Sequence, residues 1–387
     1  MNDDRFTVRS GTSEAFRETA RSRRVALLLP DMGGGGAERV ALTLAEYFVA
    51  AGHEVDLVLM RAEGALLAAL PAGIHLVDLG TSRIRSAIPA FARYLKERQP
   101  QAVQVSMWPL TIAAIVARAL AGSSTRIVTS DHTILSKQYP RSRPLIHAFL
   151  KWSVRLLYPR AEARVMVANE AADDLARLSG LDRSAIEVIY NPVAGPPANL
   201  QPRPDIDRLW GDAETRIITV GSLKGEKNHP LLVRAFARAF RGPRARLMIV
   251  GEGPLREQLE QTIEAEDVRE QVVLPGFTSD PWPFYASADL FVMSSDFEGY
   301  PLVLVEALRS GLRIVSTDCR SGPREILDGG RFGTLVPVGD EAALADAMRA
   351  RLAEPIDRAA LQAQAEALSG RQTCERYLRL MLDAVPA

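Results

Sequence analysis

Two glutamates in the C-terminal third of the chain are spaced to bind a ligand at the end of a helix. Glu298 and Glu306 lie eight residues apart in an otherwise apolar run. Pro301 is favoured in a first helical turn, so a helix is expected to begin there and to leave the amides of Leu302 and Val303 without intrahelical partners. Such a helix end attracts phosphate, and carboxylates accept hydrogen bonds from vicinal hydroxyls. The two acids therefore fit a nucleotide sugar better than they fit a solvated helix face.

A second stretch, Val220-Gly-Ser-Leu-Lys-Gly-Glu-Lys-Asn-His229, places cations between a strand and a helix. Lys224 and Lys227 lie in this short connection. Cations at such a position suit a diphosphate, because they neutralise its charge next to a helix end. The alternative is that both lysines belong to an ordinary surface loop.

Four consecutive glycines, Gly33 to Gly36, stand between the first apolar run and the first amphipathic segment. Glycine allows a ligand to approach the backbone closely, and amides at a helix start can hold an anion. A dinucleotide fingerprint would need a further glycine at position 38 or 39, where Glu38 and Arg39 stand. The run is therefore either an anion-binding loop or a flexible connection, and it does not match the fingerprint of a nicotinamide-dependent enzyme.

Short apolar runs of strand length alternate with amphipathic segments along most of the chain, which is typical of parallel sheets covered on both faces. Helices are expected at 37–50, 228–241, 254–266 and 301–310, with a helical stretch at 357–382. Strands are expected at 25–29, 55–60, 102–106, 126–130, 164–167, 186–190, 216–220, 246–250, 271–274, 290–293, 313–316 and 333–336. The fold class is α/β, with two doubly wound Rossmann-like domains facing each other across a cleft.

Five prolines between residues 191 and 211 indicate a linker between the domains. We expect a disordered tail at 1–24, an N-terminal acceptor-binding domain at 25–195, the linker at 196–211 and a donor-binding domain at 212–370. A final helix at 371–387 is expected to pack back on the N-terminal domain. Asp205 and Asp207 form an Asp-x-Asp pattern, but they lie in the linker and are not taken as a metal site.

The composition restricts partners and compartment. The 47 Lys and Arg residues balance the 47 Asp and Glu residues, which argues against a nucleic-acid partner that binds through its phosphates. The two cysteines, Cys319 and Cys374, provide neither a disulfide framework nor a metal cluster. The sequence shows no signal peptide and no run of apolar residues long enough to span a membrane. A cytoplasmic protein is expected.

Residues 137–164 are basic and aromatic. They hold seven Lys or Arg residues against one acid, Glu162, with Tyr139, Phe149, Trp152 and Tyr158 interleaved. A basic amphipathic helix of this kind suits an anionic membrane surface. An ordinary packed helix with a solvated basic face fits the same residues equally well.

The ordered set of motifs resembles the retaining family-4 glycosyltransferases of the GT-B fold, over most of the chain from Val25 to about Leu327. The set comprises Gly33–Gly36, Ser130-Asp131-His132, Tyr190-Asn191-Pro192-Val193, Gly221–Asn228, Pro275-Gly276-Phe277 and Glu298–Glu306. The stretch Cys319-Arg320-Ser321-Gly322-Pro323-Arg324-Glu325 is similar to a loop of members that build bacterial surface polysaccharides or exopolysaccharides.

The resemblance implies roles for individual residues. His132 and Glu298 would be catalytic, with His132 near the reacting centre and Glu298 on the donor sugar, and Glu306 would hold the ribose. The donor-binding set would be Gly35, Gly36, Ser222, Lys224, Lys227, Gly276, Phe277, Gly299, Leu302, Val303 and Glu306. The family usually has Arg where Ser222 stands, so Lys224 is expected to supply the missing cation.

The function implied is transfer of a hexose or N-acetylhexosamine, with retention, from a UDP- or GDP-linked sugar. The acceptor would be a glycan, polyprenyl-diphosphate-linked or a free oligosaccharide, at the inner face of the cytoplasmic membrane. No metal and no other cofactor is expected, because cations and helix amides can stabilise the departing diphosphate. Two alternatives stay open: a nucleotide-sugar epimerase on the same scaffold, and an NAD-dependent oxidoreductase.

Overall fold

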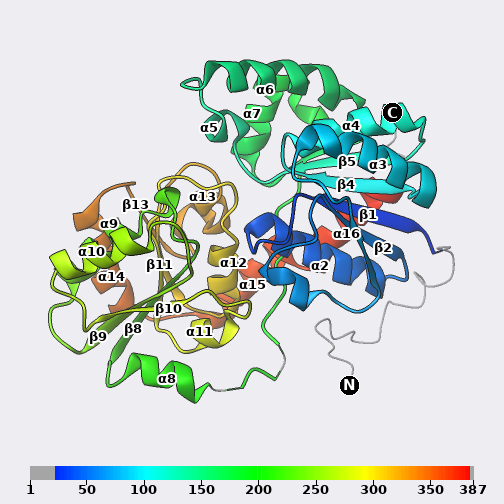
Figure 1. Ribbon diagram of the computed structural model, residues 1–387. Coiled ribbons are helices and arrows are strands. Elements are labelled where there is room, and N and C mark those ends of the chain that lie inside the picture. Colours follow the sequence, from blue (N-terminus) through cyan, green and yellow to red (C-terminus); the bar gives the residue numbers. More distant parts are fainter. Residues whose placement is uncertain (1–21, 198, 202, 384–387) are drawn as a thin grey trace. The chain divides into compact units, whose positions relative to one another are not determined.

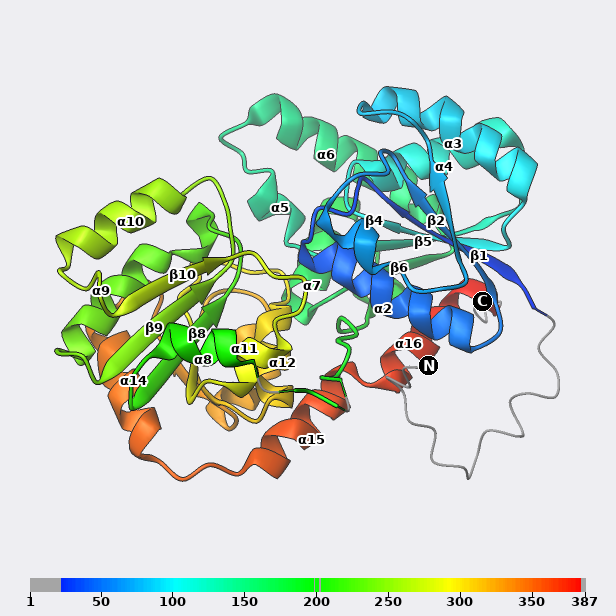
Figure 2. The same ribbon diagram turned by 60° about the horizontal axis from the view of Figure 1, so that its bottom comes forward.

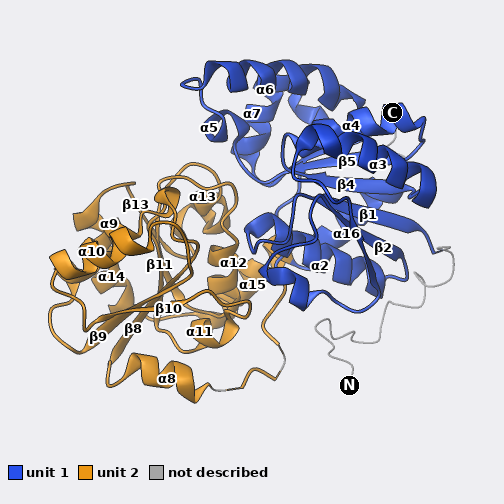
Figure 3. Cartoon of the chain, viewed as in Figure 1, with its two compact units in different colours: residues 1–193, 370–387 blue, residues 194–369 orange. Residues whose placement is uncertain are grey.

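The computed structural model describes residues 22–197, 199–201 and 203–383, and it divides into two compact α/β units (Figures 1 and 3). Unit 1 lies within residues 1–193 and 370–387, and unit 2 within 194–369. Both are Rossmann-like, which confirms the predicted fold class. The predicted tail, residues 1–24, lies outside the described residues up to residue 21, and β1 already begins at Arg24. The cleft expected between the units stays a prediction.

Unit 1 is built on a seven-stranded sheet in the order β3-β2-β1-β4-β5-β6-β7, in which every described pairing is parallel. The strands are β1 (Arg24–Leu29), β2 (Glu54–Leu59), β3 (Ile74–Asp78), β4 (Ala102–Ser106), β5 (Arg126–Asp131), β6 (Ala163–Met166) and β7 (Glu187–Val188). The helices are α2 (Gly36–Ala50), α3 (Ile84–Arg98), α4 (Leu110–Ala121), α5 (Leu135–Gln138), α6 (Pro144–Leu157), α7 (Asn169–Ser179) and α16 (Arg371–Leu382). Short 3-10 turns lie at Ala65–Ala69, Tyr158–Arg160 and Arg183–Ala185.

The central strands of unit 1 are apolar on both faces because helices cover both. Ala26 and Leu28 of β1 join a buried cluster with Phe91 of α3 and Ala114 of α4. Side chains of a strand alternate between its faces, so Leu27 points to the opposite side and is also fully buried. Helix α16 contacts α2, β4 and β5, as Figure 2 illustrates.

Helix α16 belongs to unit 1 although unit 2 separates it from the rest of that unit in the sequence. The Tyr377 hydroxyl lies 3.1 Å from the Ser130 hydroxyl at the carboxyl end of β5. At the C-terminal end of the helix, Arg23 donates to the Leu382 carbonyl at 3.1 Å and Arg126 to the Leu380 carbonyl at 3.3 Å. Cations at a helix C-terminus stabilise it by satisfying its last carbonyls.

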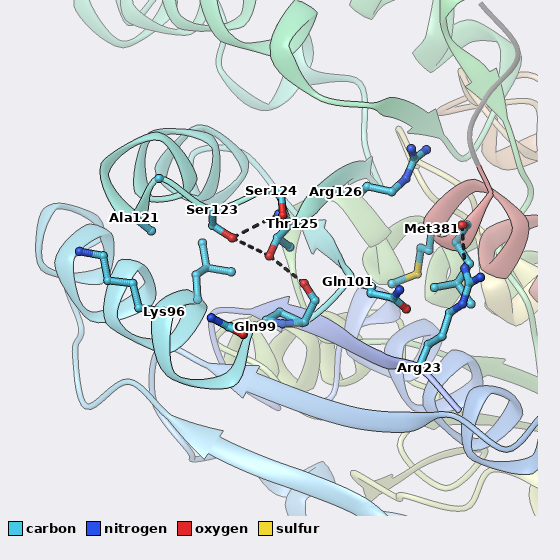
Figure 4. A pocket seen from close by; sticks show the side chains of 14 residues that line it. Arg23, Lys96, Gln99, Gln101, Ala121, Ser123, Ser124, Thr125, Arg126 and Met381 are labelled. Atoms are coloured by element: carbon cyan, nitrogen blue, oxygen red, sulfur yellow. Dashed lines mark hydrogen bonds between the residues drawn. The ribbon is translucent and has the colours of Figure 1, made fainter. Parts of the chain in front are cut away.

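A hollow of about 770 Å³ lies beside these arginines, at the amino ends of β1, β4 and β5 (Figure 4). Lys96, Gln99 and Gln101 line it together with Arg23 and Arg126. It opens at the edge of the sheet opposite to the one where Asp131 and His132 follow β5. The hollow therefore does not coincide with the predicted acceptor site.

Unit 2 has a six-stranded parallel sheet in the order β10-β9-β8-β11-β12-β13. The strands are β8 (Thr215–Val220), β9 (Ala245–Val250), β10 (Val272–Gly276), β11 (Leu290–Met293), β12 (Arg313–Thr317) and β13 (Thr334–Val336). The helices are α8 (Pro204–Trp210), α9 (His229–Ala239), α10 (Arg256–Ala265), α11 (Trp282–Ala286), α12 (Leu302–Arg309), α13 (Pro323–Ile326), α14 (Glu341–Ala353) and α15 (Arg358–Ser369), with 3-10 turns at Gly225–Lys227 and Asp328–Gly330.

The core of unit 2 lies where α9 and α14 pack on the sheet. Phe236 of α9 and Met348 of α14 are fully buried in one cluster with Leu247 and Val292 of the strands. Helix α12 packs beside α15. These contacts fix the starts of α9 and α12, which follow β8 and β11.

The structure corrects three predictions. Residues 74–78 form the strand β3, which was not predicted. The predicted linker at 196–211 contains the helix α8, whose Ile206 and Trp210 are buried. The helical stretch predicted at 357–382 is two helices, separated at Gly370, which is the residue before α16. None of the helices in the described ranges is both long and apolar enough to cross a bilayer.

The loops that follow β8 and β9 pass so close together that a glycine is required at their contact. A Cβ on Gly251, whose φ is +152°, would lie 1.9 Å from the Gly221 carbonyl oxygen. Gly242 also has a positive φ, of +97°, but a Cβ there would meet nothing within 4 Å.

We predict that Gly251→Ala lowers the free energy of unfolding by about 1–3 kcal/mol more than Gly242→Ala does, because only the former adds a backbone clash to the conformational strain. Urea denaturation of both variants measures the difference. Equal losses in the two variants would show that the two loops can separate without cost.

Candidate active site

The carboxyl ends of β8 and β11 bring together the two predicted donor motifs of unit 2. These strands are neighbours in the sheet although they are not consecutive in sequence, so the chain leaves them in opposite directions. Ligands of doubly wound sheets bind at this kind of switch point. Lys227 follows β8 and Glu298 follows β11, and the Lys227 Nζ lies 2.6 Å from the Glu298 Oε1. The structure thus joins residues that are 71 positions apart.

Hydrogen bonds from its own loop hold Glu298 in place. The Ser295 hydroxyl donates to the same Oε1 at 2.6 Å, and Thr317 at the end of β12 donates to the Ser295 carbonyl at 2.6 Å. The Glu298 side chain is 9% exposed and that of Lys227 is 21% exposed. An ion pair that is partly withdrawn from water is stronger and less screened by salt than one on the surface.

The turn after Glu298 is packed against the loop that follows β12. The Ser321 hydroxyl donates to the Gly299 carbonyl at 2.7 Å. Gly322 has φ of +102°, and a Cβ there would lie 2.4 Å from the Cδ of Pro301. The loop after β12 therefore sets the position of the start of α12.

Helix α12 begins at Leu302, with Pro301 as the residue before its first turn, one residue later than predicted. Within the described part of the chain, no group accepts a hydrogen bond from the amides of Leu302 or Val303, whereas Leu304 donates to the Pro301 carbonyl at 3.1 Å. Glu306 lies in the second turn and is only 6% exposed. The hydroxyl of the buried Tyr285 donates to its Oε2 at 2.7 Å.

Two further predicted donor residues, Ser222 and Lys224, lie in the loop that follows β8. Ser222 is partly buried and Lys224 is exposed. The Lys227 side chain passes over Gly221, since a Cβ on that glycine would lie 3.8 Å from the Lys227 Cε. Lys227 is therefore the lysine that the fold directs along the loop toward Glu298, and the substitution of Lys224 for the missing arginine stays a prediction.

Gly276 and Phe277 of the predicted donor-binding set lie at the carboxyl end of β10. Gly276 ends β10 with φ of +92°, and its carbonyl accepts from the Gly251 amide at 2.9 Å. The Phe277 ring that follows is 45% exposed. An exposed aromatic ring at the carboxyl edge of a parallel sheet offers a face on which a base can stack.

In unit 1 the glycine run forms the connection from β1 to α2. Gly35 is the residue before the helix and Gly36 its first residue. The run is supported by a second loop, because a Cβ on Gly64 would lie 2.2 Å from the Met32 carbonyl carbon, and Met32 itself donates to the Glu63 carbonyl at 2.8 Å. The run is thus a shaped loop at a helix start.

His132 directly follows β5 and is surrounded by polar groups of unit 1. Its Nδ1 lies 3.1 Å from the Asn191 Oδ1, and its Nε2 lies 3.4 Å and 3.5 Å from the hydroxyls of Ser130 and Ser106. Burial lowers the pKa of His132 to about 4, although the Asn191 contact acts in the opposite direction. The imidazole is therefore neutral at physiological pH, and with Asn191 as acceptor its proton lies on Nδ1.

The neighbouring Asp131 is buried and fully hydrogen-bonded. Its Oδ1 accepts from the Trp108 amide at 2.9 Å and its Oδ2 from the Tyr158 hydroxyl at 2.6 Å. Burial raises the pKa of Asp131 to about 6, while these two hydrogen bonds lower it. Asp131 thus ties the ends of β4 and β5 together and sets the position of His132.

Several residues that shape the site were not given a role from the sequence. Tyr285, Trp108 and Tyr158 contact the site from more than 20 residues away in the sequence, so their spacing carried no signal. Ser295 lies three residues before Glu298, and the sequence alone did not show that its hydroxyl turns toward that carboxylate. Asn191 belongs to the motif Tyr190-Asn191-Pro192-Val193, and its position directly after the strand predicted at 186–190 could have indicated a site residue. Asp205 and Asp207 lie in α8 and pair with Arg203 and Arg216 at 2.7 Å and 3.7 Å.

Two family models match the chain, one in each unit. The model described as Glycosyltransferase Family 4 matches residues 34–194, and the model described as Glycosyl transferases group 1 matches residues 207–368. Together they span both Rossmann-like units and both sets of motifs. The chain is a family-4-type glycosyltransferase of the GT-B fold.

Relatives of this glycosyltransferase include two bacterial enzymes of known role. A 4-alpha-N-acetylgalactosaminyltransferase from Campylobacter jejuni, named for an undecaprenol-diphosphate-linked substrate, is 28% identical over 85% of this chain and 90% of its own. The amylovoran biosynthesis glycosyltransferase AmsD of Erwinia amylovora is 24% identical over 76% of this chain and 80% of its own.

Solved structures show the same fold. HepE of Anabaena, determined in complex with UDP and glucose, superposes with a TM-score of 0.76 at 18% identity over 92% of this chain and 98% of its own. The lipopolysaccharide galactosyltransferase WaaB gives a TM-score of 0.69 at 19% identity over 94% of this chain and all of its own.

The lowered pKa of His132 makes the stability of the glycosyltransferase depend on pH. Between pH 6.5 and about 4 the unfolded chain binds a proton at this residue and the folded chain does not, so stability falls as pH falls through this range. We predict that His132→Gln reduces the loss of stability between pH 7 and pH 5, measured by urea denaturation at each pH.

The exposed His75 provides the matched control, because His75→Gln leaves the buried network untouched. Buried His229, whose pKa burial also lowers to about 4, is kept in all three proteins and cancels in the comparison. An unchanged pH dependence in His132→Gln would contradict the neutral state assigned to His132.

Proposed function

We propose that the chain transfers a hexose or N-acetylhexosamine, with retention, from a nucleoside-diphosphate sugar to a glycan acceptor carried on a polyprenyl diphosphate, in the synthesis of a surface polysaccharide or exopolysaccharide. The observation that carries the proposal is the arrangement at the carboxyl edge of unit 2. There, Lys227, Glu298 and the start of α12 meet at the switch point of the sheet. The names of the Campylobacter and Erwinia relatives support the acceptor class.

The proposed chemistry follows from the charge that develops when the sugar–diphosphate bond breaks. The departing diphosphate gains negative charge, and Lys227 together with the amides of Leu302 and Val303 would stabilise it. These groups can do so without a metal ion, so we propose that the reaction needs none. Glu306 would bind the ribose hydroxyls, and Glu298 would bind the donor sugar.

The proposed role of unit 1 is to hold the acceptor. His132 is neutral, so it would take part as a hydrogen-bonding partner near the reacting centre and not as a fixed cation. We propose a front-face reaction in which the departing phosphate helps to deprotonate the acceptor hydroxyl. An acceptor on a polyprenyl carrier would place the enzyme at the inner face of the cytoplasmic membrane.

The two alternative functions, an epimerase and an NAD-dependent oxidoreductase, explain fewer features of the chain. An epimerase would act on the donor alone and would need no acceptor domain. An NAD-dependent oxidoreductase would use the glycine run, which lacks the third glycine of the fingerprint at positions 38 and 39.

The proposal predicts selective stabilisation by one nucleoside diphosphate. Thermal unfolding is measured with UDP, GDP and ADP, with their sugar conjugates and with NAD, each with and without EDTA. We expect one diphosphate and its sugar conjugate to raise the Tm in both conditions, because the phosphates bind to protein groups. A rise in Tm with NAD alone would favour the NAD-dependent oxidoreductase. A rise in Tm that EDTA abolishes would contradict metal independence.

For Glu298, we predict that Glu298→Gln lowers the rate of sugar transfer by about 10²–10³-fold, because the charge facing the donor sugar is lost. The substitution keeps the size of the side chain and its contact with Ser295. Glu341→Gln is the control, since it removes an ion pair with Arg234 elsewhere in unit 2. The rate of sugar transfer from the identified donor is measured for both variants. A Glu298→Gln variant as active as the wild type would show that Glu298 has no role in the reaction.

Tyr285 is predicted to position Glu306. Tyr285→Phe removes the 2.7 Å hydrogen bond to Oε2, and we expect nucleotide affinity to fall about tenfold, since a hydrogen bond to a charged group contributes about 1.5–3 kcal/mol. Tyr94→Phe removes a similar buried bond to Asp56, of 2.9 Å, from unit 1. Calorimetric titration with the identified nucleotide should separate the two, and equal affinities would leave Tyr285 with a structural role only.

A further inference from the structure

Helix α6 of unit 1 presents an apolar stripe to solvent on the side opposite to its packed side. Leu145, Phe149, Trp152 and Leu156 recur at intervals of four, three and four residues, which aligns them along one side of a helix. Leu145 is 85% exposed and Trp152 60% exposed, and the other two exceed 40%. Val154, on the other side, is fully buried. A contiguous patch of large apolar side chains of this kind marks an interaction surface.

The surroundings of this α6 stripe are positively charged. Lys137, Arg141, Arg143, Lys151 and Arg155 lie on or just before the helix. None of these five takes part in an ion pair with any residue that the structure describes. The one acid of the segment, Glu162, is paired with Arg118 at 2.7 Å. Some arginines elsewhere in unit 1 are paired with acids, as Arg98 is with Asp56 at 2.9 Å. The positive charge beside the stripe is therefore uncompensated.

Aromatic contacts connect the stripe to the carboxyl edge of the sheet. Trp108 stands just after β4, where its amide binds Asp131 next to His132. The centroid of its ring lies 4.5 Å from the ring centroid of Tyr139 and 5.8 Å from that of Phe149. The Phe149 ring in turn lies 6.1 Å from that of Trp152. A continuous series of rings thus leads from the edge that carries His132 to the exposed side of α6.

We propose that the α6 stripe, with its basic flank, is the surface by which this chain docks on an anionic lipid bilayer. The four apolar side chains would enter the boundary between headgroups and acyl chains, while the lysines and arginines would contact lipid phosphates. Both features are needed, since apolar contact supplies burial and the cations select anionic lipid. A soluble protein partner would not require an uncompensated basic flank together with apolar side chains of this size.

Docking through α6 would place the carboxyl edge of unit 1 near the membrane surface. A diphosphate-linked acceptor presents its sugar at that depth, so His132 would meet it without extraction of the lipid. This consequence rests on the proposed function, whereas lipid docking itself does not.

Flotation of the full chain with vesicles tests the proposal. We expect binding to vesicles of phosphatidylcholine mixed with phosphatidylglycerol, weaker binding to phosphatidylcholine alone, and release by high salt. Leu145→Gln combined with Trp152→Gln should weaken binding more than about tenfold. Lys151→Gln combined with Arg155→Gln should weaken it about fivefold for each cation removed.

Matched controls come from the same unit. Leu120→Gln replaces an apolar residue of α4 that is 65% exposed, and Arg93→Gln removes an exposed cation of α3. Neither should change vesicle binding. Lipids brominated in their acyl chains should quench tryptophan fluorescence of the wild type, and Trp152→Phe should remove this quenching while retaining binding. Thermal unfolding of each variant reports that the fold is kept.

Three outcomes would overturn the proposal: no binding to anionic vesicles, equal binding by the stripe variant and Leu120→Gln, or self-association that the stripe variant abolishes. Transfer to a short, soluble acceptor separates this proposal from the proposed function. The stripe variant should keep that activity, while an inactive wild type that still binds vesicles would refute the transferase and leave the docking surface standing.

Discussion

The contact between Lys227 and Glu298 is the interaction on which the proposed donor site depends. The two residues come from loops after different strands, and each is largely withdrawn from water. Their 2.6 Å contact fixes the loop after β8 to the turn that begins α12. Removing one partner would leave the other charge poorly solvated, so neither loop can be altered without effect on the other.

A bound donor would compete with Glu298 for the Lys227 ammonium group. A diphosphate bound at the start of α12, as proposed, would offer Lys227 a second anion, and the Ser295 hydroxyl would still donate to Glu298 if the lysine turned toward the phosphate. The paired state therefore keeps two opposite charges satisfied in the ligand-free chain. It also places both groups before a ligand arrives, which lowers the entropy lost on binding.

The sequence predicted the elements whose signal is local. Strands β4 and β11 are marked by continuous apolar runs, and the helices α2 and α12 are marked by the glycines or the proline at their starts. The predicted bounds of these four elements agree with the structure to within one residue. Strand β3 was missed because, at the edge of the sheet, its side chains are mostly exposed and form no continuous apolar run. Helix α8 was missed because several prolines precede it in the sequence, although Pro204 stands at its first position, where proline is tolerated.

Predictions for the site divide along the same line. The motifs singled out Lys227 and Glu298, which lie in short loops, and Glu306, which lies in the second turn of α12. Their roles toward a donor stay predictions. They could not identify Tyr285, which reaches Glu306 from a separate helix, nor the direct pairing of Lys227 with Glu298. For residues 137–164 the composition left two interpretations open, because only the burial of Leu150, Ser153 and Val154 shows which side of α6 faces the protein.

The return of α16 to unit 1 has a consequence for the order in which the chain is synthesised. Residues 194–369 are contiguous, so unit 2 is complete on the ribosome before α16 has been made. Unit 1 starts first and finishes last, since the Tyr377 hydroxyl that meets Ser130 emerges only after the whole of unit 2. Until then the surfaces of β4 and β5 that α16 covers stay open to solvent. Unit 1, whose synthesis starts first, can therefore complete its fold only after unit 2 has been synthesised.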